Sequence, residues 1–300
     1  MQTWTREHDL PVPSSYTSGY CQARQRMDLG FLREIHERVL SQLDSAIVEK
    51  DQWRGLTLKA IDGTSCQLAD TPANQEVFPQ PKSQKPGCGF PVFDGVGLVN
   101  LSHGGIETFV SSPGTTHDAK TAPHLLKALN ARELLLADRA FSSYEIIATI
   151  THHQRAHCLM RLHQSRHGIL DWRKGRRLSK NERLVTWKKG RKPPKSTLTP
   201  DEWGALPETL TLRLIKLRYE NRAEERSEIV LVTDLLDPIL YPADELSDLY
   251  HERWKIELTF RDLKTTMKLE KLEVKSPAMA EKTALMMQVG YNLLHSHPTG

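Results

Sequence analysis

The stretch "ELLLADRAF", residues 133–141, has the pattern of a strand that is buried on both faces and ends at a charge. Its continuous apolar run, residues 134–137, is typical of a strand in the middle of a sheet covered on both sides. Asp138 follows this run directly, and a buried carboxylate is costly without a partner. The stretch therefore predicts a central strand that carries a functional carboxylate at its end.

Further strands are predicted on both sides of this one. "RGLTLKAIDGTS" alternates in polarity and predicts a strand that ends near Asp62 and is broken by Gly63. "FPVFDGVGLVNLSHGGIETFV" predicts strands at 92–101 and 106–110, joined by a turn at two glycines. "AHCLMRL" predicts another short strand, and "TLTLRLIKLRY" and "SEIVLVTDLL" predict two more.

Helical patterns lie between and around the strands. Apolar residues recur near the 3.6-residue period over 29–47. Ser142 and Glu145 form an S-x-x-E capping box that predicts the start of a helix. Residues 116–129 predict a short or broken helix, and a long helix is expected after Pro242.

This order of elements predicts an α/β fold, a mixed sheet flanked by helices and interrupted by a β-rich insertion. The predicted divisions are an N-terminal helical segment at 1–50, the first part of the sheet domain at 51–160, a basic β-rich insertion at 161–240 and a C-terminal helical part at 241–300. A chain of 300 residues with 38% hydrophobic and 26% charged residues can bury a core of this size.

The sequence has no apolar run near the roughly 18 residues that a membrane span needs, and no apolar leader. We therefore expect no membrane partner. Its four cysteines are scattered without a C-x-x-C pair, which predicts buried thiols in a reducing compartment. A cytoplasmic location, on the nucleoid when DNA is bound, is the expectation.

Positive charge is concentrated in one segment. Residues 161–195 contain thirteen Lys or Arg against Asp171 and Glu182, a net charge of +11, so the rest of a chain at +4 sums to −7. A solvated loop is one explanation. Trp172 and Trp187 are interleaved with the cations, however, and this combination favours nucleic acid, because cations neutralise phosphates and aromatic faces stack on bases.

Two aspartates, Asp62 and Asp138, are predicted at the ends of neighbouring strands, where carboxylates can converge on a divalent metal. Either could instead belong to a strand-ending turn or a helix cap, and for Asp62 alone that reading would be preferred. Asp70, Asp94 and Asp118 are competing carboxylates.

The stretch "LYHERWKIELTFRDLK", residues 249–264, has an unusual polar edge. On a helix of 3.6 residues per turn, Tyr250, Arg253, Glu257 and Lys264 fall within an arc of about 60° beside the apolar stripe. An Arg253–Glu257 ion pair is worth only about 0.2–0.5 kcal/mol and explains neither of the other two. The group suits a metal-bound phosphodiester, with Glu257 on the metal and the other three on phosphate oxygens.

At the spacing Tyr250-x2-Arg253-x3-Glu257-x6-Lys264, these residues resemble the Y-R-E-K signature of a family of insertion-sequence DDE transposases. "IDGTS" and "LLLADRAF" resemble the two aspartate segments of that family. The insertion lies between the second aspartate and the glutamate, and the likeness runs over about residues 22–284.

The resemblance implies an RNase H-like catalytic fold in which Asp62, Asp138 and Glu257 bind the metal and are catalytic. It implies Mg²⁺, with Mn²⁺ able to substitute, cutting of double-stranded DNA at the inverted-repeat ends, and strand transfer by a freed 3′-OH. It also implies a homodimer on DNA and, in some relatives, a hairpin intermediate with a flipped base held by a tryptophan. The candidates for that tryptophan are Trp172, Trp187 and Trp203.

DNA contacts are expected from the quartet and from the basic insertion. The residues chosen are Tyr250, Arg253, Lys264, Arg176, Arg177, Lys188, Lys189 and Trp187. Members of the family are usually longer, with an end-recognising helical domain before the first catalytic strand. The alternative function is therefore a truncated, inactive DNA-binding remnant that represses an intact relative. A general RNase H-like nuclease of a host pathway is a third possibility.

Overall fold

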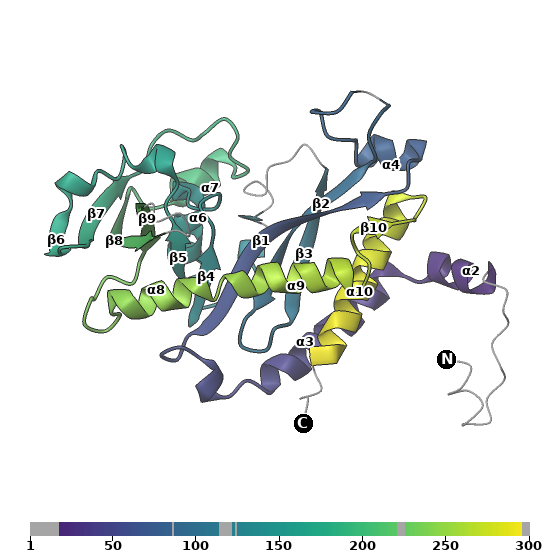
Figure 1. The fold of residues 1–300 in the computed structure, drawn as a ribbon, viewed down its shortest axis with the longest axis horizontal. Helices are drawn as coiled ribbons and strands as arrows, with labels where there is room; N and C mark the ends of the chain where they lie inside the picture. Colours follow the sequence, from purple (N-terminus) through teal and green to yellow (C-terminus); the bar gives the residue numbers. More distant parts are fainter. Residues whose placement is uncertain (1–17, 86, 114–121, 124, 221–225, 296–300) are drawn as a thin grey trace.

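The computed structural model describes residues 18–85, 87–113, 122–123, 125–220 and 226–295 (Figure 1). The strands are β1 Thr57–Leu68, β2 Val92–Asn100, β3 Ile106–Pro113, β4 Glu133–Ala137, β5 His157–Arg161, β6 Arg176–Ser179, β7 Glu182–Lys188, β8 Thr209–Glu220, β9 Arg226–Thr233 and β10 Lys271–Leu272. The helices are α2 Ser18–Arg26, α3 Leu29–Ser45, α4 Pro72–Val77, α6 Tyr144–Ala148, α7 Pro200–Ala205, α8 Ala243–His251, α9 Trp254–Thr265 and α10 Pro277–His295. Single turns are η1 Glu49–Asp51, η2 Thr149–His153, η3 Gln164–Arg166 and η4 Trp172–Lys174.

These strands form one mixed sheet in the order β3-β2-β1-β4-β5-β9-β8-β7-β6, with β10 beside β1. Strands β1, β4 and β5 are parallel, and β2, β3 and β9 run antiparallel to their neighbours. The predicted mixed sheet with helices is therefore confirmed. The broken helix expected at 116–129 lies largely outside the described residues.

The central strand β4 has the environment that its apolar run predicts. Its residues 134–137 are fully buried. Leu134 and Leu136 face a core that also contains residues of α8, α9 and α10, whereas Leu135 and Ala137 face a second core with α6. Because helices cover both faces, every side chain of this run must be apolar.

Strand β1 does not end at Asp62, so that prediction is wrong. It continues through Gly63, which pairs with Val96, and reaches Leu68. A glycine does not end a strand when the neighbouring strand continues to hydrogen-bond with it. Strand β2 pairs with β1 without interruption from Lys59 onward. Asp62 is a mid-strand residue.

The predicted capping box is shifted by one residue. Ser143, and not Ser142, is the N-cap of α6, and its hydroxyl accepts a hydrogen bond from the Ile146 N–H. Ser142 is fully buried, where it donates to the Arg139 carbonyl and accepts from the His163 N–H. A tertiary role therefore replaces the local cap.

The insertion continues the main sheet. Strand β9 pairs with β5, with Leu159 opposite Thr233 and Arg161 opposite Leu231. Trp187 and Leu212 share one hydrophobic core with residues of α6. Segment 161–240 is thus a β-rich extension of the same sheet (Figure 1).

The long helix expected after Pro242 is two helices, α8 and α9. Their junction at Glu252 and Arg253 keeps helical backbone angles but is closed by hydrogen bonds to the third preceding residue. The Arg253 N–H donates to the Tyr250 carbonyl, and the Ile256 N–H to the Arg253 carbonyl. This tighter turn changes the spacing of side chains from that of one ideal helix.

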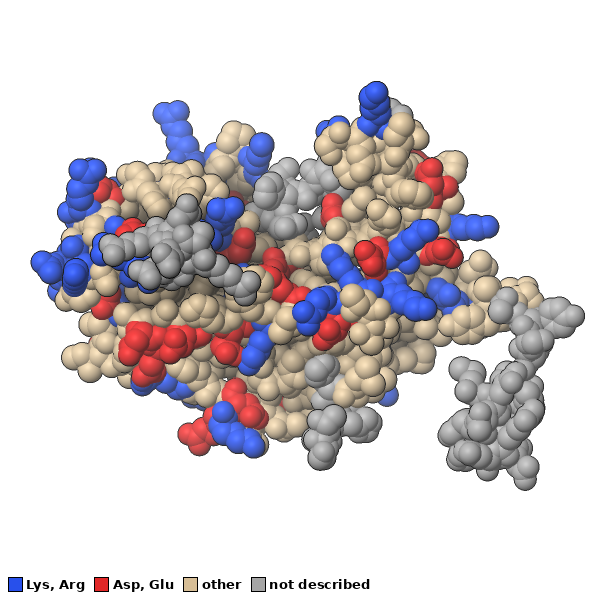
Figure 2. All heavy atoms as spheres, in the orientation of Figure 1, with Lys and Arg blue, Asp and Glu red and all other residues tan. Residues whose placement is uncertain are grey.

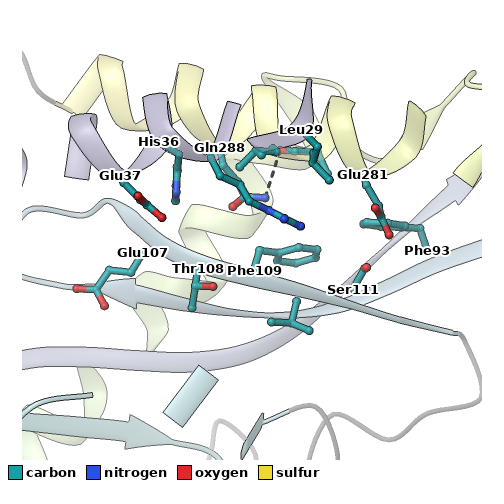
Figure 3. Close-up of a pocket in the computed structure, with 14 residues that line it drawn as sticks. Leu29, His36, Glu37, Phe93, Glu107, Thr108, Phe109, Ser111, Glu281 and Gln288 are labelled. Atoms are coloured by element: carbon teal, nitrogen blue, oxygen red, sulfur yellow. Dashed lines mark hydrogen bonds between the residues drawn. The ribbon is translucent and has the colours of Figure 1, made fainter. Parts of the chain in front are cut away.

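Helices α3 and α10 pack together over β3 and enclose a cavity of about 350 Å³, toward which His36 and Gln288 point (Figure 3). Asn292 of α10 is fully buried beside β3. Its side-chain amide hydrogen-bonds the backbone of Ile106, as a further strand would. Its Oδ1 accepts from the Ile106 N–H at 2.8 Å, and its Nδ2 donates to the Ile106 carbonyl at 2.9 Å.

We expect Asn292→Ala to lower the free energy of unfolding by about 2 kcal/mol, because it leaves a buried backbone N–H without a partner. Urea denaturation measures this change. Leu294→Ala is the control, since Leu294 is on the same helix and is 69% exposed. Equal effects of the two substitutions would mean that the amide bridge adds nothing.

Candidate active site

Three polar residues stand in a row at one end of the parallel strands. The last paired residues of β1 and β4 are Ile61 and Ala137, and Ala137 in turn pairs with Met160 of β5. The next residues on the three strands are Asp62, Asp138 and Arg161. Parallel strands in register therefore place the two predicted aspartates side by side, although only Asp138 ends its strand.

Helix α9 brings Glu257 to the same place. It packs closely on the sheet because Gly97, the partner of Asp62 on β2, has no side chain: a Cβ there would be 2.8 Å from the ring of Phe260. Phe260 lies one helical turn from Glu257. The glycine thus allows the approach that sets the third carboxylate opposite Asp62.

Arg253 connects these carboxylates. Its Nη2 donates to Glu257 Oε1 at 2.8 Å, and its Nη1 lies 3.3 Å from Asp62 Oδ2. Burial lowers the pKa of Arg253, but Tyr250, Glu257 and Asp62 outweigh it, so the pKa is raised and the charge is held. The ion pair with Glu257 is therefore part of a half-buried bridge and not an isolated surface pair.

The ionisation of Asp62 is strongly perturbed by its surroundings. The pKa of Asp62 is raised to about 6, chiefly by burial, with smaller contributions from the anions of Asp138 and Glu257. A hydrogen bond from the Gly63 N–H at 2.9 Å and the charge of Arg253 oppose this shift. Carboxylates that repel one another in a partly desolvated site form a candidate site for a cation.

Tyr250 and Arg161 complete the cluster. Burial raises the pKa of Tyr250, with a further contribution from Asp138, while Arg253 and Arg161 lower it. The Asp138 Oδ1 accepts from the Ala140 N–H at 2.7 Å, which orients the carboxylate. In the sequence, Arg161 stands out only as part of the basic stretch 161–195. Its position at the end of β5, matching Asp138 at the end of β4, was the available signal.

Lys264 and Trp254 flank this cluster on α9. Lys264 is half-buried against β1, where its charge opposes the rise in the pKa of Cys66 that burial causes. Trp254 is 56% exposed and its ring lies 5.7 Å from the guanidinium of Arg253. The sequence pattern favours Trp172, Trp187 and Trp203 instead, and the signal for Trp254 is its position directly after Arg253.

The chemistry of the donor set fits a hard divalent cation, because Asp62, Asp138 and Glu257 offer only carboxylate oxygens. Among the described residues, one group of three has its potential metal-ligand atoms within 4.8 Å of one another, and it is Asp44, His103 and Glu107. Asp62, Asp138 and Glu257 are not that close together. Arg253 stands between Asp62 and Glu257 instead and supplies positive charge there.

That other group consists of Asp44, His103 and Glu107. Glu107 is already neutralised by Lys59, which is 3% exposed and whose Nζ lies 2.7 Å from Glu107 Oε2 and 2.7 Å from Glu133 Oε1. His103 pairs with Asp44 at 3.1 Å. The charged groups of this cluster are therefore paired with one another and with Lys59, and they form a structural network that joins β1, β3 and β4.

Some of the predicted DNA-binding residues of the basic insertion are exposed, and others are engaged in contacts within the protein. Arg176, Arg177 and Lys188 are exposed at the outer strands, where blue side chains gather at the β6 end of the molecule (Figure 2). Lys189 is engaged: its Nζ lies 2.6 Å from Glu208 and donates to the Leu206 carbonyl at 2.7 Å.

The tryptophans of the insertion are mostly internal. Trp187 is 5% exposed and meets Tyr144 edge to face, so the expectation that it stacks on DNA does not fit its position. Trp203 is 8% exposed in the same core. Trp172 is half-buried between Arg183 and Lys216, whose charges lie 4.8 Å and 4.6 Å from its ring. Alternation along β7 turns Trp187 inward.

Two further expectations concern the chain as a whole. All four cysteines are free thiols; Cys66 and Cys158 are buried, whereas Cys21 and Cys88 are exposed. Within the part of the chain that the structure describes, every helix is too short or too polar to cross a membrane.

Comparison with known proteins identifies relatives of this chain. It is 27% identical over 285 residues to the transposase InsG for insertion sequence element IS4 of Escherichia coli, covering 92% of this chain and 60% of that protein. It is 27% identical over 134 residues to the putative transposase InsZ of the same organism, covering 44% and 45%. The chain thus spans less than two thirds of the length of these curated relatives.

Among solved structures, a piggyBac transposase synaptic complex with hairpin DNA matches with a TM-score of 0.49 and 8% identity, covering 80% of this chain and 46% of that one. A sequence profile described as the transposase DDE domain matches residues 53–293, a range that contains both aspartates and the glutamate of the site. The chain therefore belongs to the transposase DDE domain family.

Proposed function

We propose that this protein is a DDE transposase that cuts double-stranded DNA at the ends of an insertion sequence and joins a freed 3′-OH to target DNA. The observation that carries the proposal is the clustering of Asp62, Asp138 and Glu257 inside the segment that matches the transposase DDE domain. The Asp138 and Glu257 anions are close enough to add to the rise in the pKa of Asp62 that burial causes. InsG, with which it shares 27% identity, is a transposase.

An RNase H-like core is part of this proposal. The order β3-β2-β1-β4-β5, with an antiparallel β1–β2–β3 meander followed by two strands parallel to β1, supports it. Asp138 stands at the carboxyl end of β4, the side on which ligands bind in parallel sheets, and Asp62 lies beside it on β1.

Asp62, Asp138 and Glu257 would hold Mg²⁺, with Mn²⁺ able to replace it. When bound, such a cation activates an attacking oxygen and neutralises the leaving oxygen of a phosphodiester. The bridge between Asp62 and Glu257 made by Arg253 keeps these two carboxylates together. In the proposed complex Arg253 donates to phosphate oxygens, for which a guanidinium is suited, and Tyr250 donates a further hydrogen bond.

DNA contacts beyond the reacting phosphate are proposed for Lys264, Arg176, Arg177 and Lys188, which retain half-buried or exposed side chains. Trp254, exposed beside Arg253, replaces Trp187 as the aromatic side chain placed to stack on an unpaired base. Assembly as a homodimer on two DNA ends remains part of the proposal.

The test is cleavage of a duplex that carries the ends of the element, in Mg²⁺ and in a chelator. We expect nicking in Mg²⁺ alone, and we expect Glu257→Gln to lower its rate by more than about 100-fold, since even residues that only orient metal ligands are worth 10–100-fold. Binding to the same duplex at low salt should persist, because Glu257→Gln removes a negative charge and no cation.

Glu252→Gln is the matched control. Glu252 lies five residues earlier on the same helical stretch and pairs with Lys255 at the surface. Nicking that survives Glu257→Gln would sink the enzymatic proposal. Duplex binding by a wild-type protein that never nicks would favour the alternative, a non-catalytic DNA-binding protein that competes with an intact relative.

A further inference from the structure

A basic pocket lies at the end of α9 that is remote from Glu257. It is a cavity of about 650 Å³ between α2, the end of α9, β10 and α10. Its cationic side chains are Arg24, Lys264, Lys268 and Lys271, and its acidic ones are Glu270 and Glu273. Figure 2 shows blue side chains gathered over the end of α9 and β10, with red ones among them.

Most of these cations have no acidic partner. Among the described residues, no ion pair forms to Arg24, Lys264 or Lys268, and Lys271 has only a 3.8 Å contact with the largely exposed Glu273. Arg24 and Lys264 are half-buried, and Lys268 and Lys271 are exposed. Unpaired cations drawn together in a concavity raise the local concentration of anions.

Arg24 is fixed in place with hydrogen-bonding capacity left over. Its Nη2 donates to the Thr283 hydroxyl of α10 at 2.8 Å, and its guanidinium lies 5.6 Å from the ring of Tyr20. Its Nε is buried and has no hydrogen-bond partner. A guanidinium anchored at one nitrogen has donors free for an oxyanion, and its planar fork suits phosphate.

Lys268 occupies a backbone position that glycine would fill more easily. It follows the end of α9 with φ of 58°, in the left-handed region, and the Leu269 N–H closes the helix end on the Leu263 carbonyl at 3.0 Å. Helices commonly place glycine here because it has no Cβ. An observed strained backbone conformation is a reason to test the side chain for a function.

We propose that this pocket binds phosphates of the DNA backbone at a distance from the reacting bond, with Arg24, Lys268 and Lys271 as the contacting cations. The proposal rests on the proposed function. From Glu257 to Lys264 the helix rises about 10 Å, the length of roughly three base pairs, and Lys268 lies one turn further. A duplex whose backbone follows α9 from the carboxylates therefore reaches the pocket within a few base pairs.

The test uses duplex DNA in a chelator, so that binding is measured without cleavage, with fluorescence anisotropy over 50 to 200 mM salt as the readout. Each phosphate contact contributes about −0.9 to the slope of log K against log salt. We expect Lys268→Gln/Lys271→Gln to reduce the magnitude of this slope by about 2. The charge-matched control Arg38→Gln/Lys50→Gln, on exposed positions of α3 and η1, should leave it unchanged.

Lys268→Gly separates a role in binding from a role in folding. It removes the cation and relieves the backbone, so we expect a higher Tm together with weaker DNA binding. A slope equal to that of the control in the double variant, with salt-dependent binding intact in the wild type, would overturn this inference alone. A wild-type protein without salt-dependent duplex binding would overturn the proposed function and this inference together.

Discussion

Asp62→Asn is expected to abolish metal-dependent DNA cleavage and, at the same time, to raise the stability of the protein at neutral pH. The carboxyl of Asp62 has a pKa of about 6 in the folded protein and an ordinary value of 3.8. The folded state therefore binds its proton more tightly than the unfolded state. The contribution of Asp62 to the free energy of unfolding is therefore most favourable below pH 3.8, and it is lost as the pH rises through about 6.

At pH 7.5 the ionised Asp62 costs the fold up to about 3 kcal/mol, at about 1.4 kcal/mol per pKa unit. Asparagine has no charge to desolvate and keeps an oxygen that can accept from the Gly63 N–H. We therefore expect Tm at pH 7.5 to rise by several degrees, given about 2–4 °C per kcal/mol for chains of 150–250 residues. Near pH 4 the two proteins should differ little.

Asp70→Asn is the control, because Asp70 is an exposed carboxylate just past the end of β1. A second readout does not depend on activity: Mg²⁺ should raise the Tm of the wild type, since it binds the folded state, and should raise that of Asp62→Asn much less. An Asp62→Asn protein that melts below the wild type at pH 7.5 would show that this carboxylate does not destabilise the fold. The rate of cleavage by the wild type should also decline below about pH 6.

Much of the fold could be predicted because the hydrophobic pattern of each short segment indicates its secondary structure. The run 134–137 predicts a doubly covered strand, and the apolar segments "TLTLRLIKLRY" and "SEIVLVTDLL" predict β8 and β9. Predictions failed where a distant partner decides. Strand β1 passes through Gly63 because β2 continues beside it, and Ser142 leaves its cap position to hold Arg139 and His163.

The candidate site shows the same division. The choice of Asp62, Asp138 and Glu257 depended on motifs that resemble those of a known family, and a sequence displays such motifs directly. The three-residue turn at Arg253 could not be predicted, because an amphipathic pattern is compatible with one straight helix or with two short ones. Nor could the orientation of Trp187, since a strand register that moves by one residue exchanges the two faces.

Arg213→Met is expected to cost the fold about 3–5 kcal/mol, the range for removing one partner of a buried ion pair. Arg213 on β8 is fully buried, and its Nε donates to Glu182 Oε2 at 2.8 Å. Its Nη1 donates to the Tyr241 carbonyl at 2.6 Å and lies 3.4 Å from the carbonyls of Leu235 and Asp237. One side chain thus ties the insertion to the segment that leads into α8.

Thermal and urea unfolding measure this loss, and a double-mutant cycle with Glu182→Leu isolates the pair. Arg213→Met/Glu182→Leu should be less destabilised than the sum of the single variants, because it leaves no unpaired charge in the core. Arg218→Met is the control: Arg218 is on the same strand, its side chain is 63% exposed, and it pairs with Glu228 at the surface, where such pairs are worth up to about 1 kcal/mol. If both arginine variants lost the same small amount of stability, Arg213 would not be holding the insertion.

Because α8 carries Tyr250 toward Asp138, a loosened segment at 235–241 should also slow cleavage in protein that remains folded. This effect on the rate distinguishes the contact made by Arg213 from a purely local contribution to stability.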